Sequence, residues 1–585
     1  MAALYSSGLI SPIPFSFEPT TIRIGVTGHR TLQNPDRICA SVFRILTTLD
    51  ERLAGTPHHY QVISALADGA DRLVAHAVLG WKVQHQPTSD SLNPTLELVL
   101  PMPEEIYYGT FQNKSPVTSA EEFRALAARA SRQTLVPPPT EASGMPPAEI
   151  YRDKRYRDLA YKRAGELVVE NCDILISVWD GKPAAGIGGT ADAVNHARAR
   201  GTSLVWIHSS TAKINWPGRG DDFLSQLDAL AEYNADSRSD ASISQEVAKR
   251  LSCLVDYATT ASFPAQTLAP LQLAILPHFV KASSLAAKNQ EAYFRWGIIG
   301  YACAAGSVAT AAYLSILGHT LSHYWFLLEV FLLLVALGSG YSLKHFRWQH
   351  NWIDYRYLAE RLRATCFLYA AGVKFEPPPE FPDLLISWLP HGWMTIALRE
   401  LWRTLPPSNT VSSLSANKAQ VQSLARFLFK AWIDHQQTYY EHAARTNHRK
   451  NEQLELLSLL ILGATVAIAL THSFAREELM KKIFGANGDH WLSMLAVSLP
   501  AVVSAVASVI VYMHFRRNAE RYESMGHYLK GVGEDLLKAA GLSHDSDREP
   551  DLLKIQAIVE DADHAMAHEH EGWRTVFGVR LPGPG

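Results

Sequence analysis

Four long apolar runs constrain this chain more than any other feature of its sequence. They cover residues 296–317, 324–343, 456–470 and 491–515. The first has about 22 residues without a charge, and about 20 are enough for a helix to cross a bilayer. Aromatic residues mark the ends of the runs, as in many membrane helices: Trp296, Tyr324, Trp325 and Trp491. The pattern predicts an all-α membrane region with four transmembrane helices in two hairpins.

Basic residues beside these runs predict how the chain crosses the membrane. Lysine and arginine cluster before the first and third runs and after the second and fourth, and the loop 318–323 has neither. The loop 471–490 balances three basic residues against three acidic ones, so it carries a weaker signal. The positive-inside rule therefore places both termini in the cytoplasm.

A cytoplasmic helix is expected to continue each even-numbered span without a break. One runs from Lys344 to Ala371 and the other begins at Arg516; both contain Ala-Glu-Arg and end in Ala-Ala-Gly. These shared features indicate a duplicated architecture of helix, two spans and helix. We therefore expect two hairpin units, 291–375 and 413–585, joined by a Pro-rich linker at 376–412.

The first part of the chain has a different pattern, in which short apolar runs alternate with helical stretches. Strands are predicted at 22–27, 61–66, 96–100, 173–178 and 203–207, with helices at 36–53, beginning over 68–71, at 119–133 and at 151–171. Such alternation predicts an α/β fold with a parallel, Rossmann-like sheet over residues 21–210. Residues 211–290 are a helical connector in this interpretation. Residues 1–20 lack a signal peptide's basic and apolar segments and are expected to be disordered.

Ligands of parallel sheets bind beyond the carboxyl ends of the strands, at a switch point in the strand order. Three predicted strand ends carry glycine and polar residues, in GVTGHR, in ALADGAD and in WDG followed by GGT. A glycine-rich turn at a helix start presents backbone N–H groups and a positive dipole end, which suits a phosphate. A tight turn that needs glycine only for steric reasons explains the same residues. The candidate ligand-binding residues are Thr27, Gly28, His29, Arg30, Asp68, Gly69, Asp71, Trp179, Asp180, Gly181, Gly188, Gly189 and Thr190.

The side chains in this set suggest different roles. Thr27, Gly28 and the turn 188–190 are suited to approach phosphates by their backbone, while Arg30 adds a fork of donors. Asp71 or Asp180 suits a ribose or a base. His29 fits a hydrogen-bonded structural position as well as a ligand contact. Trp179 suits either stacking on a base or a buried position at the rim of the site.

In this order, the motifs GVTGHR, ALADGADRLVA and DILISVWDGKPAAGIGGTADAV resemble the SLOG superfamily. These are Rossmann-like domains related to the DprA and LOG proteins, and the resemblance covers about residues 20–210. LOG enzymes carry PGGxGTxxE, whose glutamate serves N-glycosidic cleavage of a nucleoside monophosphate. Alignment of Gly189-Thr190 with this GT places Ala193 at the glutamate and Ala185 at the proline. The resemblance therefore implies nucleotide binding without that catalytic acid.

Each hairpin unit looks like a SLATT domain, the two-span effector found beside SLOG sensors. The two resemblances imply a cytoplasmic sensor of a nucleotide-derived signal, coupled to a membrane-permeabilising effector of the bacterial inner membrane. They further imply a homo-oligomer with a role in anti-phage defence. Two other functions remain open: a membrane-anchored nucleotide N-glycosidase or NAD-consuming hydrolase, and a membrane scaffold with a degenerate Rossmann-like domain.

Other binding chemistry is not indicated. The net charge of −3 gives no electrostatic case for nucleic acid. The five cysteines lack CxxC spacing, which argues against a zinc site or a disulfide frame. His564, His568 and His570 lack a metal-binding partner pattern, so we expect a solvated helix face there. Beyond a nucleotide-type ligand, no cofactor or metal is expected.

Overall fold

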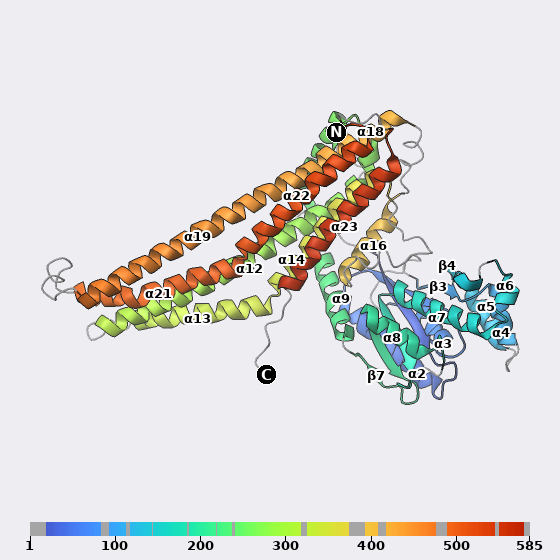
Figure 1. Ribbon diagram of the computed structural model, residues 1–585. Coiled ribbons are helices and arrows are strands. Elements are labelled where there is room, and N and C mark those ends of the chain that lie inside the picture. The colour runs from blue at the N-terminus through green and yellow to red at the C-terminus, as the bar shows by residue number, and fades with distance from the viewer. Residues whose placement is uncertain are drawn as a thin grey trace. The chain divides into compact units, whose positions relative to one another are not determined.

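The computed structural model describes residues 19–83, 93–112, 118–142, 144–183, 186–217, 219–236, 240–317, 324–373, 392–406, 417–474, 488–543 and 549–577. The chain forms two compact units, each built from three stretches (Figure 1). The α/β unit contains Met1–Gln245, Leu273–His278 and Lys374–Pro407, and the helical unit contains Glu246–Gln272, Phe279–Val373 and Ser408–Gly585. The loop 318–323 and nearly all of the expected disordered start lie outside the described residues, as do most of the loop 471–490 and of the predicted linker.

The α/β unit is built on a seven-stranded sheet with the order β4-β3-β2-β1-β5-β6-β7. All neighbouring strands are parallel except the β6–β7 pair, which makes the sheet mixed but mostly parallel. The strands are β1 (Thr20–Gly28), β2 (His58–Ser64), β3 (Thr95–Leu100), β4 (Arg132–Leu135), β5 (Ile174–Trp179), β6 (Ser203–His208) and β7 (Ile214–Asn215). The predicted α/β fold is confirmed, and β4 and β7 are additions to it.

Helices connect these strands and cover the sheet: α2 (Pro35–Arg52), α3 (Ala70–Leu79), α4 (Glu104–Gln112), α5 (Thr118–Ala127), α6 (Pro147–Ile150), α7 (Lys154–Asn171), α8 (Thr190–Arg200) and α9 (Arg219–Ala235). Apolar residues at helical spacing bury one face of α2, among them Ile38, Val42, Ile45 and Leu49. The helix predicted over 119–133 is wrong at its end. Residues 132–135 pair with β3 instead, because sheet hydrogen bonds override a short stretch's helical preference.

The order of the strands creates a switch point between β1 and β5. The chain moves outward from β1 through β2 and β3 to β4, then returns through α7 to β5 on the other side of β1. Because crossovers between parallel strands are right-handed, moving along the sheet in opposite directions puts the connecting helices on opposite faces. Helices α2 and α3 therefore cover one face of the sheet, and α7 and α8 cover the other. The carboxyl ends of β1 and β5 therefore border the crevice where such sheets bind ligands.

A further helix of the α/β unit lies in the stretch predicted to be a linker. Helix α16 (Trp393–Thr404) packs against β1 and α9. Its apolar face is buried through Trp393, Ile396 and Leu401. The chain between the two hairpins thus returns to the sheet and is part of the α/β unit.

The helical unit consists of most of α10 (Asp240–Thr260), of the short α11 (Ala269–Ala274) and of α12 (Leu276–Leu317), together with α13 (Tyr324–His345), α14 (Trp348–Ala370), α18 (Lys418–Leu428), α19 (Asp434–Phe474), α21 (Gly488–Met513), α22 (Phe515–Ala539) and α23 (Leu552–Phe577). A π-helical turn, η4 (Phe429–Ile433), joins α18 to α19. Within the described part of the chain, four helical stretches are long and apolar enough to cross a membrane, in the α12, α13, α19 and α21 regions. This confirms the predicted all-α region with four candidate spans.

Aromatic clusters lie at both ends of these spans. At one end, the Tyr293 and Tyr512 ring centroids are 4.9 Å apart. At the other, Tyr313 lies 5.0 Å from Trp325 and 6.1 Å from Trp491. Tyr293 and Tyr313 belong to the same helix, and the usual helical rise separates them by about 30 Å. This is about the thickness of the hydrocarbon core of a bilayer, whose two interfaces favour aromatic rings.

The expectation that helices continue past the second and fourth spans without a break is wrong. Arg347 separates α13 from α14 with a φ of 49°, and His514 separates α21 from α22 with a φ of 51°. Left-handed backbone at a residue other than glycine costs roughly 1–2 kcal/mol. The unbroken helices are instead α12 and α19, which lead into the first and third spans.

The two hairpin units share further backbone details. Asn351 N–H donates to Arg347 O at 3.0 Å, and Asn518 N–H donates to His514 O at 2.9 Å. Each helix after the break ends in Ala-Ala-Gly with the glycine left-handed, at φ 71° for Gly372 and 64° for Gly541. The two hairpin units thus have matching helix breaks and matching glycine caps. The duplication inferred from the sequence is therefore also present in the backbone.

Candidate functional site at the carboxyl ends of the strands

A histidine–aspartate pair spans the switch point between β1 and β5. His29 follows β1 and Asp180 follows β5; His29 Nε2 lies 3.2 Å from Asp180 Oδ1. The Asp180 backbone N–H also donates to His29 Nε2, at 3.1 Å. The Lys182 backbone N–H, together with His29, lowers the pKa of Asp180. Both side chains are about one-third exposed, so this pair presents solvent-accessible polar atoms at the switch point.

The loop after β2 reaches the same place under backbone constraint. Gly69 has a φ of 85°, and a β-carbon there would lie 2.6 Å from His29 O. Leu66 adopts a left-handed φ of 54° although it is buried, and such strain is concentrated at functional sites. Asp68 accepts a hydrogen bond from Ser119 Oγ and lies 3.1 Å from Arg72 Nη1. Gly69 therefore allows contact between the first two motifs, while Asp68 fastens the loop.

Asp71 is a buried carboxyl beneath this loop, 6% exposed. Its Oδ2 accepts from Ser64 Oγ at 3.3 Å and from the Ala67 N–H at 3.4 Å. Burial raises its pKa from 3.8 to about 7, although these hydrogen bonds and the charges of Arg30 and Arg72 oppose the rise. Carboxyl groups with a pKa near neutral are common at functional sites, so Asp71 is a candidate for a functional residue.

Arg30 carries an exposed positive charge at this edge. Its guanidinium carbon lies 5.4 Å from the ring centroid of Tyr161, on α7. Tyr107 lies 6.3 Å from Tyr161 and donates to Ala65 O at 3.0 Å. Burial, followed by the charge of Asp71, raises the pKa of Tyr107 well above its usual value. Neither tyrosine was among the residues predicted from the sequence, since a single tyrosine within a helix belongs to no motif.

The glycine turn before α8 is partly occupied by the protein itself. Gly188 has a φ of 82°, and a β-carbon there would lie 2.8 Å from Asp158 O on α7. Its N–H donates to Asp192 Oδ2 at 2.8 Å. Gly188 thus has the steric reason considered above, while Gly189 and Thr190 begin α8 half exposed. Because the Gly188 N–H is engaged by Asp192, the phosphate contact predicted from the sequence is left to Gly189, Thr190 and the start of α8.

Trp179 lies in the core, 7% exposed. Its Nε1 donates to Lys182 O at 2.9 Å, and its ring lies 5.5 Å from Trp206. Gly181 approaches the same Trp206 ring, which a β-carbon would meet at 3.3 Å. The structure thus gives Trp179 the buried rim position and leaves Gly181 in the turn above it. Thr27 and Gly28 are half buried at the end of β1.

Ala193, which the sequence alignment above places at the glutamate of the LOG signature, faces the interior. It is 5% exposed and belongs to the core between the sheet and the α7 and α8 helices. A β-carbon on Gly165 of α7 would lie 3.6 Å from Ala193 Cβ. Since a glutamate here would be directed into apolar packing, its absence agrees with the geometry of this face.

A second polar cluster lies at the opposite, amino-terminal edge of the sheet, where α16 packs. Arg399 donates to both carboxylate oxygens of Asp173, at 2.8 and 2.7 Å, and to Thr21 O at 3.2 Å. Thr21 Oγ1 donates to Glu400 at 3.1 Å. Burial lowers the pKa of Arg399, but Asp173 more than offsets this, so the net pKa is raised. We call this cluster the α16 clasp.

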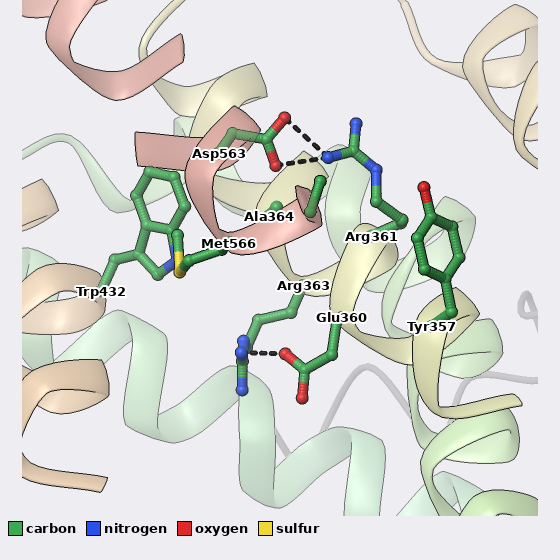
Figure 2. Close-up of a pocket in the computed structure, with 9 residues that line it drawn as sticks. Tyr357, Glu360, Arg361, Arg363, Ala364, Trp432, Asp563 and Met566 are labelled. Carbon is green, nitrogen blue, oxygen red and sulfur yellow. Dashed lines mark hydrogen bonds and ion pairs between the residues drawn. The ribbon is translucent and has the colours of Figure 1, made fainter. Parts of the chain in front are cut away.

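The helical unit contains a small internal cavity of about 10 Å³ (Figure 2). Arg361 of α14 and Asp563 of α23 face each other there, with N–O distances of 2.6 and 2.8 Å. Trp432 of η4 lies beside Met566 in the same view. The cavity has room for about one water molecule, which is too small for a ligand site. The Arg361–Asp563 ion pair beside it joins α14 to α23.

Comparisons with known proteins bear on the first hairpin only. Residues 280–375 match a protein family described as a protein of unknown function (DUF4231). They include most of α12 and all of α13 and α14, with the break at Arg347. No curated protein and no solved structure matches the chain. Among the described residues, no three histidine, cysteine or acidic side chains are grouped to hold a metal ion.

Proposed function

We propose that the α/β unit binds a phosphate-bearing, nucleotide-type ligand and that the four spans act as a membrane effector controlled by it. The supporting observation is the convergence of three separate loops at the switch point. His29 and Asp180 span β1 and β5, while Gly69 brings in the loop after β2. In this proposal, Arg30 and the start of α8 bind phosphate, and Tyr161 offers a ring beside Arg30.

The resemblance to SLOG and SLATT domains extends the proposal to a cellular role. The protein would be a homo-oligomeric effector of the bacterial inner membrane, with cytoplasmic termini, that responds to a nucleotide-derived signal in anti-phage defence. Ligand shifts the effector only if it binds one arrangement better than the other. A ligand held between two sensor domains provides this difference through assembly.

Helix continuity suggests how a signal passes along the chain. The first residues of α12, Leu276–His278, are grouped with the α/β unit, and the helix continues without a break into the first span. The second and fourth spans join their cytoplasmic helices through Arg347 and His514. We propose that α12 and α19 transmit tilt as rigid levers, while the breaks let α13 and α21 reorient.

Ligand binding is tested best by substitution of Gly189. Its φ of −86° and ψ of 173° suit any residue, so Gly189→Arg adds bulk without backbone strain. The full-length protein in nanodiscs is screened by thermal shift against mono-, di- and cyclic nucleotides and ADP-ribose. The variant should lose the shift that wild type shows. Gly109→Arg on α4 is the control, because a β-carbon there meets nothing within 4 Å. Equal affinity in a folded Gly189→Arg variant would remove Gly189 from the site.

Two further readouts separate the sensor from its alternatives. Chromatography after incubation with the bound nucleotide should show no multiple-turnover release of base; efficient release would favour an N-glycosidase. Liposomes carrying the protein should release dye when the nucleotide is added, and Gly189→Arg liposomes should not. Tight binding with neither leakage nor a change in oligomer size would favour the scaffold.

A further inference from the structure

A glycine of α12 leaves a notch that holds a hydroxyl group of the fourth span. The Tyr512 hydroxyl, on α21, donates a hydrogen bond to Tyr293 O at 2.8 Å. A β-carbon on Gly297 would lie 2.6 Å from the same hydroxyl oxygen. Residue 297 is four positions after residue 293, so a side chain there would stand beside the Tyr293 carbonyl. Because glycine has no side chain, that carbonyl accepts a second donor from another helix.

The same arrangement recurs three residues further along α12. The Ser339 hydroxyl, on α13, donates to Trp296 O, and a β-carbon on Gly300 would lie 2.7 Å from Ser339 Oγ. The glycine again comes four residues after the residue whose carbonyl accepts. Such small residues let transmembrane helices approach closely. Helix α12 therefore holds the second span of its own hairpin and the second span of the other hairpin by the same kind of contact.

The Tyr512 contact joins the two hairpins close to both helix breaks. The Tyr512 ring lies 5.9 Å from Phe294 of α12, whose ring lies 5.3 Å from Trp352 of α14. Tyr512 comes two residues before the break at His514, and Trp352 comes five residues after the break at Arg347. One short stretch of α12 thus contacts residues beside each break.

Little is lost when the Tyr512 hydrogen bond opens. Tyr293 O keeps its helical partner, the Gly297 N–H. Tyr512 belongs to an aromatic cluster at the end of the spans, where a phenol hydroxyl reaches interfacial water. Hydrogen bonds between transmembrane helices favour the bonded arrangement by only roughly 3- to 18-fold. The contact is therefore strong enough to position α21 and weak enough to open.

We propose that Tyr512 in the Gly297 notch is a releasable joint between the two hairpins, by which α12 positions α21 beside its break. This role rests on the proposed function, in which a tilt of α12 reaches the second hairpin through the joint. The Ser339 contact holds α13 on α12 in both arrangements.

Spin labels measure the joint without any nucleotide. Full-length protein in nanodiscs carries labels at the native Cys303 of α12 and at Ser504→Cys of α21, with serine at the other cysteines. Dipolar spectroscopy of the wild-type joint should give one narrow distance distribution. Gly297→Ala and Tyr512→Phe should each add a longer distance and raise its share relative to the short one by about 3- to 18-fold.

Two matched substitutions serve as controls. Tyr301→Phe removes a hydroxyl from another ring of the same cluster, 5.8 Å from Tyr512. Gly463→Ala on α19 adds a β-carbon that meets nothing within 4 Å. Neither should change the distances, and circular dichroism verifies folding. Unchanged distances in folded Gly297→Ala and Tyr512→Phe variants would overturn the joint. Equal broadening in the controls would show general loosening of the spans instead.

Dye release separates transmission through the joint from the proposed function. ADP-ribose and the mono-, di- and cyclic nucleotides are added to liposomes that carry either wild type or Gly297→Ala. The variant should keep the thermal shift that a nucleotide gives wild type, but its dye release should fall about tenfold. Release equal to that of wild type would refute transmission through the joint. If wild type releases no dye, the proposed function fails, whereas the label distances still decide whether the joint exists.

Discussion

Loss of Arg399 should destabilise the α/β unit, although α16 lies far along the chain from the strands it contacts. Arg399 and Asp173 are 16% and 7% exposed, with two charge-assisted hydrogen bonds between them. Removal of one partner of a buried pair costs about 3–5 kcal/mol, and the partial exposure of Arg399 favours the lower end. We therefore expect Arg399→Met to lower the free energy of opening of β1 and β5 by about 3 kcal/mol, a change of about 100-fold in the opening equilibrium.

Hydrogen exchange of the β1 and β5 amides in the full-length protein measures this change. The double variant Asp173→Asn/Arg399→Met removes both partners of the pair and should recover part of the loss. Recovery is incomplete because the buried Arg23 then keeps Glu97 but loses Asp173 as a carboxylate neighbour. Arg403→Met is the control on the same helix; its side chain is 37% exposed, and its loss should cost less than about 1 kcal/mol. If Arg399→Met left the exchange rates of the β1 and β5 amides unchanged, the α16 clasp would not stabilise these strands and the reasoning would be refuted.

The remaining predictions concern the helix breaks and the candidate site around His29, Asp71 and Asp180 at the carboxyl ends of the strands, called here the carboxyl-edge site. The pKa of Asp71 is about 7 in the folded protein, above its ordinary value of 3.8. Between these two values the native state binds a proton that the unfolded state does not. The free energy of unfolding should therefore fall as pH rises from 4 to 7, by at most ~4 kcal/mol. Asp71→Asn should abolish this slope in the exchange of α3 amides; an unchanged slope would assign it to another group. Arg347→Gly and His514→Gly should each stabilise the helical unit by about 1 kcal/mol, because glycine adopts left-handed backbone without the usual cost. The direction of the change in melting temperature, measured by thermal shift in nanodiscs, tests this prediction. If the helices were continuous, glycine would instead destabilise them by about the same amount. Gly188→Ala should destabilise the α/β unit even without ligand, as its β-carbon would meet Asp158 O; a stable variant would contradict the tight turn.

Sequence patterns predicted the elements whose cause is local. Strands such as Ile174–Trp179 are short apolar runs buried on both faces, and the spans are long apolar runs. Helix α16 was missed although Trp393, Ile396 and Leu401 form its buried apolar face. It lies in a Pro-rich stretch, and its Arg399 and Glu400 resemble surface residues until Asp173 and Thr21 are placed opposite them. The carboxyl-edge site was predicted from glycines and polar residues at strand ends.

Other features have no signature in the sequence. The helix breaks fall at Arg347 and His514, with neither glycine nor proline to mark them. Tyr161 enters the site only because α7 crosses back to the switch point. Trp179 had two possible positions by residue type alone, and the packing of Trp206 against it accounts for the buried one.

The α16 clasp also has a consequence for the order of events during synthesis. The strands and helices around the switch point have all left the ribosome by about residue 245, but Asp173 gains its two hydrogen bonds from Arg399 only when α16, ending at Thr404, has followed. At ordinary elongation rates this interval lasts roughly 10–30 s. The first hairpin emerges within it. The nascent chain therefore reaches the membrane while the amino-terminal edge of its sheet still lacks Arg399 and the apolar face of α16, and that edge closes only after the first pair of spans has been made.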